Sequence, residues 1–140
     1  MFFSPQIKRI NTGHYVNVEE LNSITEKIIG AAYVVSNTLG CGFLEKVYEN
    51  AMFLEILKSN FCVIKQQPLH VFYDDQVVGE YFADLLVENE VIVEIKAIKE
   101  LNEVHQAQLM NYLVACNKRC GLLINFGKPR VEIKRMLNGY

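Results

Sequence analysis

Two apolar runs separated by three polar residues constrain the fold of this chain most strongly. Residues 77–87 and 91–98 are rich in β-branched and aliphatic side chains, and Glu88-Asn89-Glu90 lies between them. Two such runs joined by a short polar loop are typical of a β-hairpin. We therefore expect residues 77–87 and 91–98 to be neighbouring strands of one sheet.

The residues on either side of this hairpin predict helices and further strands. Apolar side chains recur at three- and four-residue steps over residues 18–39, after the candidate N-cap Asn17, and again over about 44–59. The apolar face predicted for the second helix contains Leu44, Val47, Tyr48, Ala51 and Leu54. A third helix is predicted over residues 103–116, with Leu109, Tyr112 and Leu113 facing inward. Strands are also predicted over 61–66, 69–73, 121–126 and 130–136. The order α-α-β-β-β-β-α-β-β predicts an α/β protein, with a mixed sheet flanked by helices.

Length and composition narrow the class of protein. The chain has 140 residues, of which 51% are hydrophobic and 21% charged, as in ordinary globular domains. We expect an irregular N-terminal segment over residues 1–17 and a single domain over 18–140. No apolar run reaches the length of about 20 residues that spans a membrane. Residues 1–10 contain no long apolar stretch and no small-residue cleavage site, so we expect no secretory signal. The four cysteines form no CxxC pair, so we expect buried or half-buried thiols in the reducing cytoplasm.

Charge is unevenly distributed along the chain. Residues 1–117 contain 8 Lys or Arg and 15 Asp or Glu, whereas residues 118–140 contain 6 Lys or Arg and one Glu. One interpretation is a set of solvated surface charges. The other is a patch that binds phosphate, in which Arg130 and Lys134 would point to the same face of one strand. Both interpretations are compatible with the sequence.

Two acidic residues stand within the apolar strands of the hairpin. If the three-residue loop closes the hairpin, Leu85 opposes Val93 and Asp84 opposes Glu94, with Lys96 on the same face. Two adjacent carboxylates repel each other, and a divalent cation with oxygen ligands would relieve that repulsion. The alternative is a salt-bridged ladder in which Lys96 alone balances the charges.

Three further residues are candidates for a site. Glu45 lies at the start of the predicted second helix, where the helix dipole favours an acid in any case. Gln108 and Tyr112 stand four residues apart on the predicted third helix and therefore share one of its faces. Taken alone, they would form an ordinary pair of a polar and an aromatic side chain.

Taken together, these residues resemble a known family. The segment Gly42-Phe-Leu-Glu45-Lys-Val-Tyr48 matches the GxxExxY signature of a small bacterial protein family. That family is similar to the PD-(D/E)xK nuclease superfamily, whose core motif resembles Asp84 followed by Glu94-Ile95-Lys96. The segment Gln108-Leu-Met-Asn-Tyr112 resembles the QxxxY element of the superfamily's exonuclease-like branch. The resemblance extends over about residues 18–135, with Ala83 in place of the proline of the superfamily's name.

The resemblance implies a restriction-endonuclease-like fold and roles for particular residues. Asp84, Glu94 and the carbonyl of Ile95 would bind Mg²⁺ or Mn²⁺, and Lys96 would assist attack by water. Glu45 would orient water or complete the metal shell. Gln108 would hold the substrate or a metal-bound water, with Tyr112 packed behind it.

The implied function is a metal-dependent nuclease acting on DNA or RNA, with a homo-oligomer as one option. The alternative is a nuclease-like module that binds nucleic acid or protein without hydrolysis, because a fold does not establish an activity.

Overall fold

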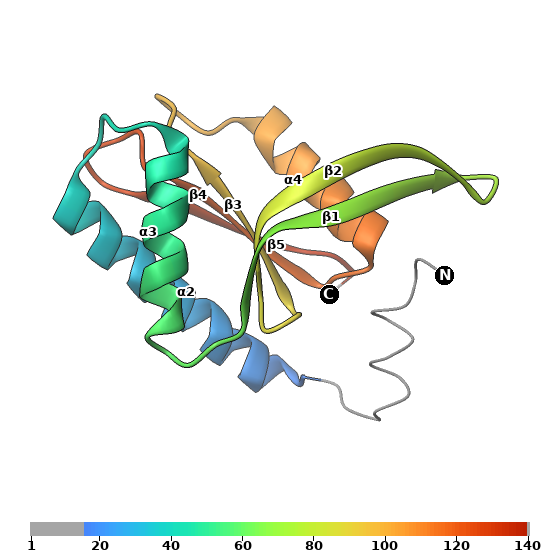
Figure 1. Cartoon of the computed structure of the whole chain (residues 1–140), viewed down its shortest axis with the longest axis horizontal. Helices are drawn as coiled ribbons and strands as arrows, with labels where there is room; N and C mark the ends of the chain where they lie inside the picture. Colours follow the sequence, from blue (N-terminus) through green and yellow to red (C-terminus); the bar gives the residue numbers. More distant parts are fainter. Residues whose placement is uncertain (1–15, 140) are drawn as a thin grey trace.

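The computed structural model describes residues 16–139, so most of the predicted irregular segment, residues 1–15, lies outside the described part. Its elements in chain order are α2 (Val18–Leu39), α3 (Glu45–Leu57), β1 (Val63–Tyr73), β2 (Gln76–Val87), β3 (Val91–Lys96), α4 (Glu103–Cys116), β4 (Cys120–Asn125) and β5 (Glu132–Leu137). The strands form one five-stranded sheet in the order β1-β2-β3-β4-β5. The β3–β4 pair is parallel and the other pairs are antiparallel. The predicted mixed sheet flanked by helices is confirmed (Figure 1).

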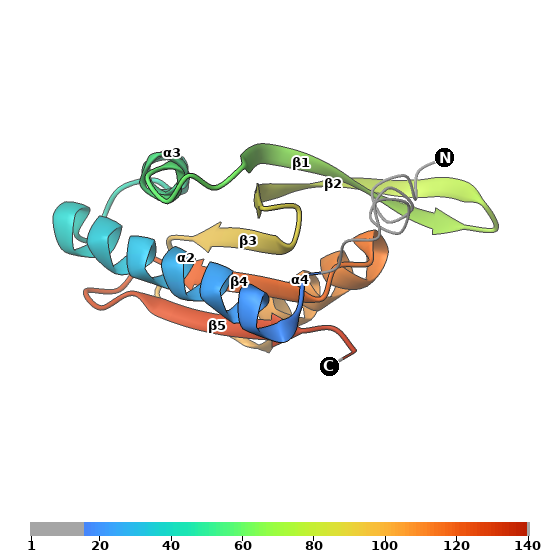
Figure 2. The same cartoon turned by 90° about the horizontal axis from the view of Figure 1, so that it is seen from below.

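The helices cover both faces of this sheet. Helices α2 and α3 pack on one face, against residues such as Val93 and Ile95, and α4 packs on the other, against Ile92 and Leu123. Figure 1 shows α2 and α3 on one side of strands β3–β5 and α4 on the other, and Figure 2 shows the β1–β2 hairpin, which extends beyond the ends of the other strands. Because the centre of the sheet is buried on both faces, β3 and β4 are almost continuously apolar.

Local signals place the ends of α2 and α4 as predicted. The side chain of Asn17 accepts a hydrogen bond from the Glu20 backbone N–H at 2.8 Å, which caps the first turn of α2. Asn102 and His105 form a capping box at the start of α4, and Asn117 ends this helix in the left-handed conformation. Leu109 and Leu113 of α4 are fully buried, and Tyr112 is half-buried beside them.

Two of the predicted strand boundaries were wrong. The strands predicted over residues 61–66 and 69–73 are one strand, β1, which begins only at Val63 and continues through Pro68. A proline is tolerated there because β1 lies at the edge of the sheet, where not every N–H has a ladder partner. At the other end of the chain, Arg130 lies in the bend before β5, which begins only at Glu132. The argument that Arg130 and Lys134 share a strand face therefore fails.

The buried face of α3 also differs from the prediction. Tyr48, Met52 and Ile56 are buried, whereas Leu44 is 81% exposed and Leu54 63% exposed. Apolar residues stand all around this helix, so their spacing alone could not indicate which side faces the core.

Tertiary contacts of Tyr48 determine how α3 is rotated. Its hydroxyl donates a hydrogen bond to the Gly40 carbonyl at 2.6 Å and accepts one from the Phe43 N–H at 3.2 Å. Its ring stacks on Phe126 with centroids 4.7 Å apart. These contacts turn the Tyr48 side of α3 toward the sheet.

The cysteines depart in part from expectation. Cys120 is buried and Cys116 is half-buried, as predicted, but Cys41 and Cys62 are exposed because they lie in connecting segments at the surface. All four are free thiols.

None of the helices formed by residues 16–139 combines the length and apolar character required to cross a membrane.

Candidate active site

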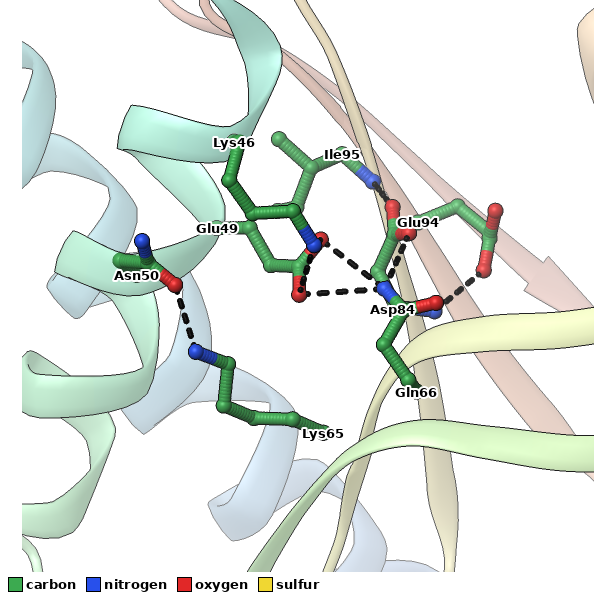
Figure 3. A network of polar contacts seen from close by, with 8 residues as sticks. All are labelled: Lys46, Glu49, Asn50, Lys65, Gln66, Asp84, Glu94 and Ile95. Atoms are coloured by element: carbon green, nitrogen blue, oxygen red, sulfur yellow. Dashed lines mark hydrogen bonds and ion pairs between the residues drawn. The ribbon is translucent and has the colours of Figure 1, made fainter.

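The two carboxylates of the hairpin meet where β2 separates from β3. The ladder pairs Leu85 with Val93 and Val87 with Val91, which confirms the predicted register. At Asp84, the next residue toward the start of β2, hydrogen bonds to side chains replace the backbone pairs of the ladder. The Asp84 N–H donates to Glu94 Oε2 at 2.9 Å, and the Ile95 N–H donates to Asp84 Oδ2 at 2.7 Å. Each carboxylate therefore accepts a hydrogen bond from a backbone N–H of the other residue's strand (Figure 3).

A polar network connects Asp84 to helix α3. The Gln66 Nε2 donates to both carboxylate oxygens of Glu49 at 3.1 Å and to Asp84 Oδ1 at 3.4 Å. Glu49 is itself buried and forms an ion pair with Lys46 at 3.1 Å. Gln66 can reach both acids because its backbone is in the left-handed region, with φ 53°, opposite Asp84. Figure 3 shows the Gln66 side chain between the carboxylates of Glu49 and Asp84.

The environment disfavours negative charge on both acids of the hairpin. Burial, followed by repulsion from Asp84, raises the pKa of Glu94 to about 8. Burial also raises the pKa of Asp84, and the charges of Glu49 and Glu45 add to this effect against the hydrogen bond from Ile95. Carboxylates held in this way gain from any added positive charge, whether a proton or a metal ion.

The end of β3 is held firmly behind this pair. The Lys96 carbonyl accepts a hydrogen bond from the Phe126 N–H at 2.8 Å. The fully buried side chain of Asn125 bonds both the N–H and the carbonyl of Ile98, at 2.9 and 3.0 Å. A Cβ at Gly127 would lie 2.0 Å from the Ile98 carbonyl oxygen, so only glycine fits there. These contacts determine where the half-buried Lys96 leaves the sheet, two residues beyond Glu94.

The carbonyl of Ile95 is oriented by the same geometry. The N–H and carbonyl of one strand residue point toward the same neighbouring strand. Since the Ile95 N–H points to Asp84 of β2, its carbonyl is directed to that side as well. The carbonyl oxygen therefore lies on the side where the two carboxylates meet.

The residues of the GxxExxY segment have distinct positions. Gly42 has φ 115°, a conformation that side chains rarely adopt, and Tyr48 is the buried anchor of α3. Glu45 is the exposed first residue of α3. It is near enough to the hairpin that its charge contributes to the raised pKa values of both Asp84 and Glu94. The glycine and the tyrosine thus place the glutamate beside the acidic pair.

Gln108 and Tyr112 lie apart from the carboxylate network. Among residues 16–139, no hydrogen bond joins Gln108 to Asp84 or Glu94. Instead, Gln108 and Tyr112 line a groove of about 790 Å³ between α4 and the β1–β2 hairpin. Burial raises the pKa of Tyr112, and the charge of Glu94 adds to this effect, so Tyr112 is near enough to the acidic pair to feel its charge.

Four of the six basic residues in 118–140 have structural partners, and one of these, Lys128, forms an ion pair with Glu132 at 3.9 Å. Lys118 is buried and donates to the Asn89 carbonyl at 2.8 Å, Arg119 donates to the Val16 carbonyl, and Arg135 donates to Asn22 Oδ1 at 2.6 Å. Arg130 and Lys134 are exposed and stand at the far end of the sheet order from β1. They remain the candidates for phosphate contact.

The donors at the hairpin fit a magnesium ion only in a particular way. Across residues 16–139, no three His, Cys, Asp or Glu side chains converge closely enough to hold an ion by themselves. Mg²⁺, however, is usually held by one or two carboxylates and completes its octahedral shell with water and substrate oxygens. Asp84, Glu94 and the Ile95 carbonyl are all oxygen donors and suit that mode of binding.

Sequence reasoning missed three residues of this network. Glu49 stands four residues after Glu45 and so shares its helix face, which is a signal that was present in the sequence. Lys46 follows from Glu49 as its ion-pair partner. Gln66 carried no such signal, because its contact with Asp84 depends on the path of β1 beside β2.

Comparison with known proteins identifies the family. Residues 22–136 match the PD-(D/E)XK nuclease superfamily, and the chain belongs to it. Its mixed sheet flanked by helices is the restriction-endonuclease-like fold. No curated protein and no solved structure matches the chain. The narrower resemblance to the GxxExxY family stays a prediction.

Proposed function

We propose that this chain is a metal-dependent phosphodiesterase that hydrolyses nucleic acid. One observation carries the proposal, namely the meeting of Asp84 and Glu94 at the point where β2 leaves β3. Keeping two acids at low exposure costs stability, as the raised pKa of Glu94 shows. Because the chain belongs to a nuclease superfamily, the presence of this costly acidic pair supports a chemical role for Asp84 and Glu94.

Each residue has a role in this proposal. Asp84, Glu94 and the Ile95 carbonyl would hold Mg²⁺ or Mn²⁺, which supplies Lewis acidity and an acidified water when bound. Lys96 orients the attacking water and offsets the negative charge that develops on the phosphate. Glu45, exposed at the start of α3, would bind a water through its carboxylate.

Further residues would bind the substrate. Gln108 and Tyr112 contact the nucleic acid beside the acidic pair, and Arg130 and Lys134 contribute phosphate contacts further along the sheet. We assign residues 18–140 to a single domain. Its small size favours contacts to the sugar–phosphate backbone over base-specific readout.

A second function has one observation in its favour. Asp84 and the Glu94 side chain each already accept a backbone N–H, and no third side chain joins them in the described part of the chain. A nuclease-like module that binds nucleic acid or protein without cleaving it would be compatible with this bonded pair.

A metal titration followed by a cleavage assay separates the two functions. Mn²⁺ should raise the melting temperature of the protein. At a Mn²⁺ concentration of 100 times the Kd, the free energy of unfolding should increase by about 2.7 kcal/mol. With Mn²⁺ or Mg²⁺, the protein should cleave at least one of single-stranded DNA, duplex DNA, flapped DNA or RNA. Asp84→Asn should reduce both effects, with a rate loss of at least about 100-fold.

Asp74→Asn is the matched control. Asp74 is an exposed turn residue with φ 50°, a conformation that asparagine adopts readily, so this variant should behave as wild type. Binding of nucleic acid without cleavage of any substrate would instead support the second function. Equal metal binding by wild type and Asp84→Asn would exclude the site.

A further inference from the structure

The groove beside the acidic pair has an unusual lining for a protein that would bind a polyanion. It lies between α4 and the β1–β2 hairpin, which pack beside each other (Figure 1). Aromatic rings of Phe72, Tyr81 and Tyr112 line it, together with the amide side chains of Gln108 and Asn111. None of its lining residues is charged. A phosphate would find no cation in this groove.

The shape and chemistry suit a flat, uncharged group with polar edges. The Tyr81 and Tyr112 rings are 5.3 Å apart and tilted by 40°, and Tyr81 is 45% exposed, so an incoming ring can reach its face. Amides supply both donors and acceptors for the edge of such a ring. The volume of about 790 Å³ is in the range of small-molecule sites. Nucleobases have these properties, and they stack on aromatic side chains whatever their sequence.

The groove lies close to the candidate active site, although Asp84 and Glu94 are not among the residues that line it. Tyr81 stands three residues before Asp84 on β2, and Tyr112 lines the groove while its pKa responds to the charge of Glu94. A strand whose phosphate lies at Asp84 and Glu94 would therefore bring a neighbouring base to the groove. A base held in a duplex cannot enter, because its faces are stacked and its edge is paired.

We propose that this groove binds an unpaired base of the substrate strand, and that the protein therefore prefers single-stranded or frayed nucleic acid. The inference rests on the proposed function and adds the class of substrate. It commits to a nucleobase as the occupant, since the lining of the groove is uncharged and partly aromatic and the groove lies close to the acidic pair.

Competition between oligonucleotides tests this proposal on the intact protein. A fluorescent dT strand is displaced by unlabelled dT, by the matching duplex, or by a strand of the same length that has only abasic sugars. Ca²⁺, which also takes oxygen ligands, replaces Mn²⁺ in the binding assay. Wild type should bind the dT strand roughly 5- to 150-fold more tightly than the abasic strand, the range expected for losing a base–aromatic stack.

Tyr81→Leu should bring this ratio close to one while it leaves the affinity for the abasic strand unchanged. Tyr73→Leu is the control, because Tyr73 is a 70% exposed tyrosine at the end of β1 and outside the groove. It should keep the wild-type ratio. Melting temperatures of both variants show whether they remain folded.

Several results would overturn the proposal. Equal affinity of wild type for dT and abasic strands would reject base binding without any variant. Cleavage of single-stranded and duplex substrates at the same rate in wild type and Tyr81→Leu would reject the groove but leave the proposed function intact. A wild-type dimer that Tyr81→Leu dissociates in sedimentation would assign the groove to a second copy of the chain. Failure to bind or cleave any oligonucleotide would reject the proposed function as well.

Discussion

Replacing Glu94 by glutamine should stabilise the metal-free protein above neutral pH. Burial and the charge of Asp84 raise the pKa of Glu94 from 4.5 to about 8 in the folded state. Between these two values, the folded protein holds a proton that the unfolded chain has released. The free energy of unfolding therefore falls as pH rises through this window. The stability that proton binding to Glu94 contributes is fully present below about pH 4.5 and is lost by about pH 8.

The size of the effect follows from the shift. At about 1.4 kcal/mol per pKa unit, a rise from 4.5 to about 8 corresponds to about 5 kcal/mol. That is a large part of the total stability of a typical domain, about 5 to 15 kcal/mol. Glutamine carries no charge at any pH, and its carbonyl oxygen can still accept the hydrogen bond from the Asp84 N–H. Glu94→Gln should therefore be close to wild type at about pH 5 and more stable by several kcal/mol at about pH 9.

Urea denaturation in EDTA across this pH range measures the difference, provided that the slope with denaturant stays constant. The control is Glu100→Gln, because Glu100 is an exposed residue in the loop after β3 and its loss should leave the pH dependence unchanged. Mn²⁺ at high pH should then stabilise wild type more than Glu94→Gln. If Glu94→Gln and wild type lost stability in parallel as pH rises, the claim that folded Glu94 holds a proton up to about pH 8 would be refuted.

Three further predictions test other parts of the molecule. Lys96→Ala should lower the cleavage rate more than the affinity for substrate, and a large loss of stability with an unchanged rate would mean that Lys96 is only a salt-bridge partner. Met52→Ala should cost about 2 to 5 kcal/mol of stability because Met52 is fully buried, whereas Leu54→Ala should cost less than about 0.5 kcal/mol; equal losses on denaturation would contradict the observed rotation of α3. Removing both Arg130 and Lys134 should flatten the log–log salt dependence of duplex binding by about 2 if each contacts a phosphate, and an unchanged slope would exclude this patch.

Local patterns were sufficient for the parts of the molecule in which neighbouring residues interact. The loop Glu88-Asn89-Glu90 predicted the β2–β3 register on the condition that these three residues close the hairpin, and the structure confirms that pairing. That register already placed Asp84 opposite Glu94. The bounds of α4 were equally predictable, since Asn102 and the residues around Asn117 mark its two ends.

Where several arrangements satisfy the local pattern, only the tertiary structure decided. Helix α3 is apolar on all sides, and its orientation depends on the packing of Tyr48 against Phe126, which is distant in the sequence. The contact of Gln66 with Glu49 and Asp84 likewise requires β1, β2 and α3 to be in place. The sequence by itself thus determined the acidic hairpin, whose residues are close along the chain, and the superfamily, whose motifs can be read without knowledge of the fold. The groove and the network around Asp84 were decided by packing between segments that come together only in the folded protein.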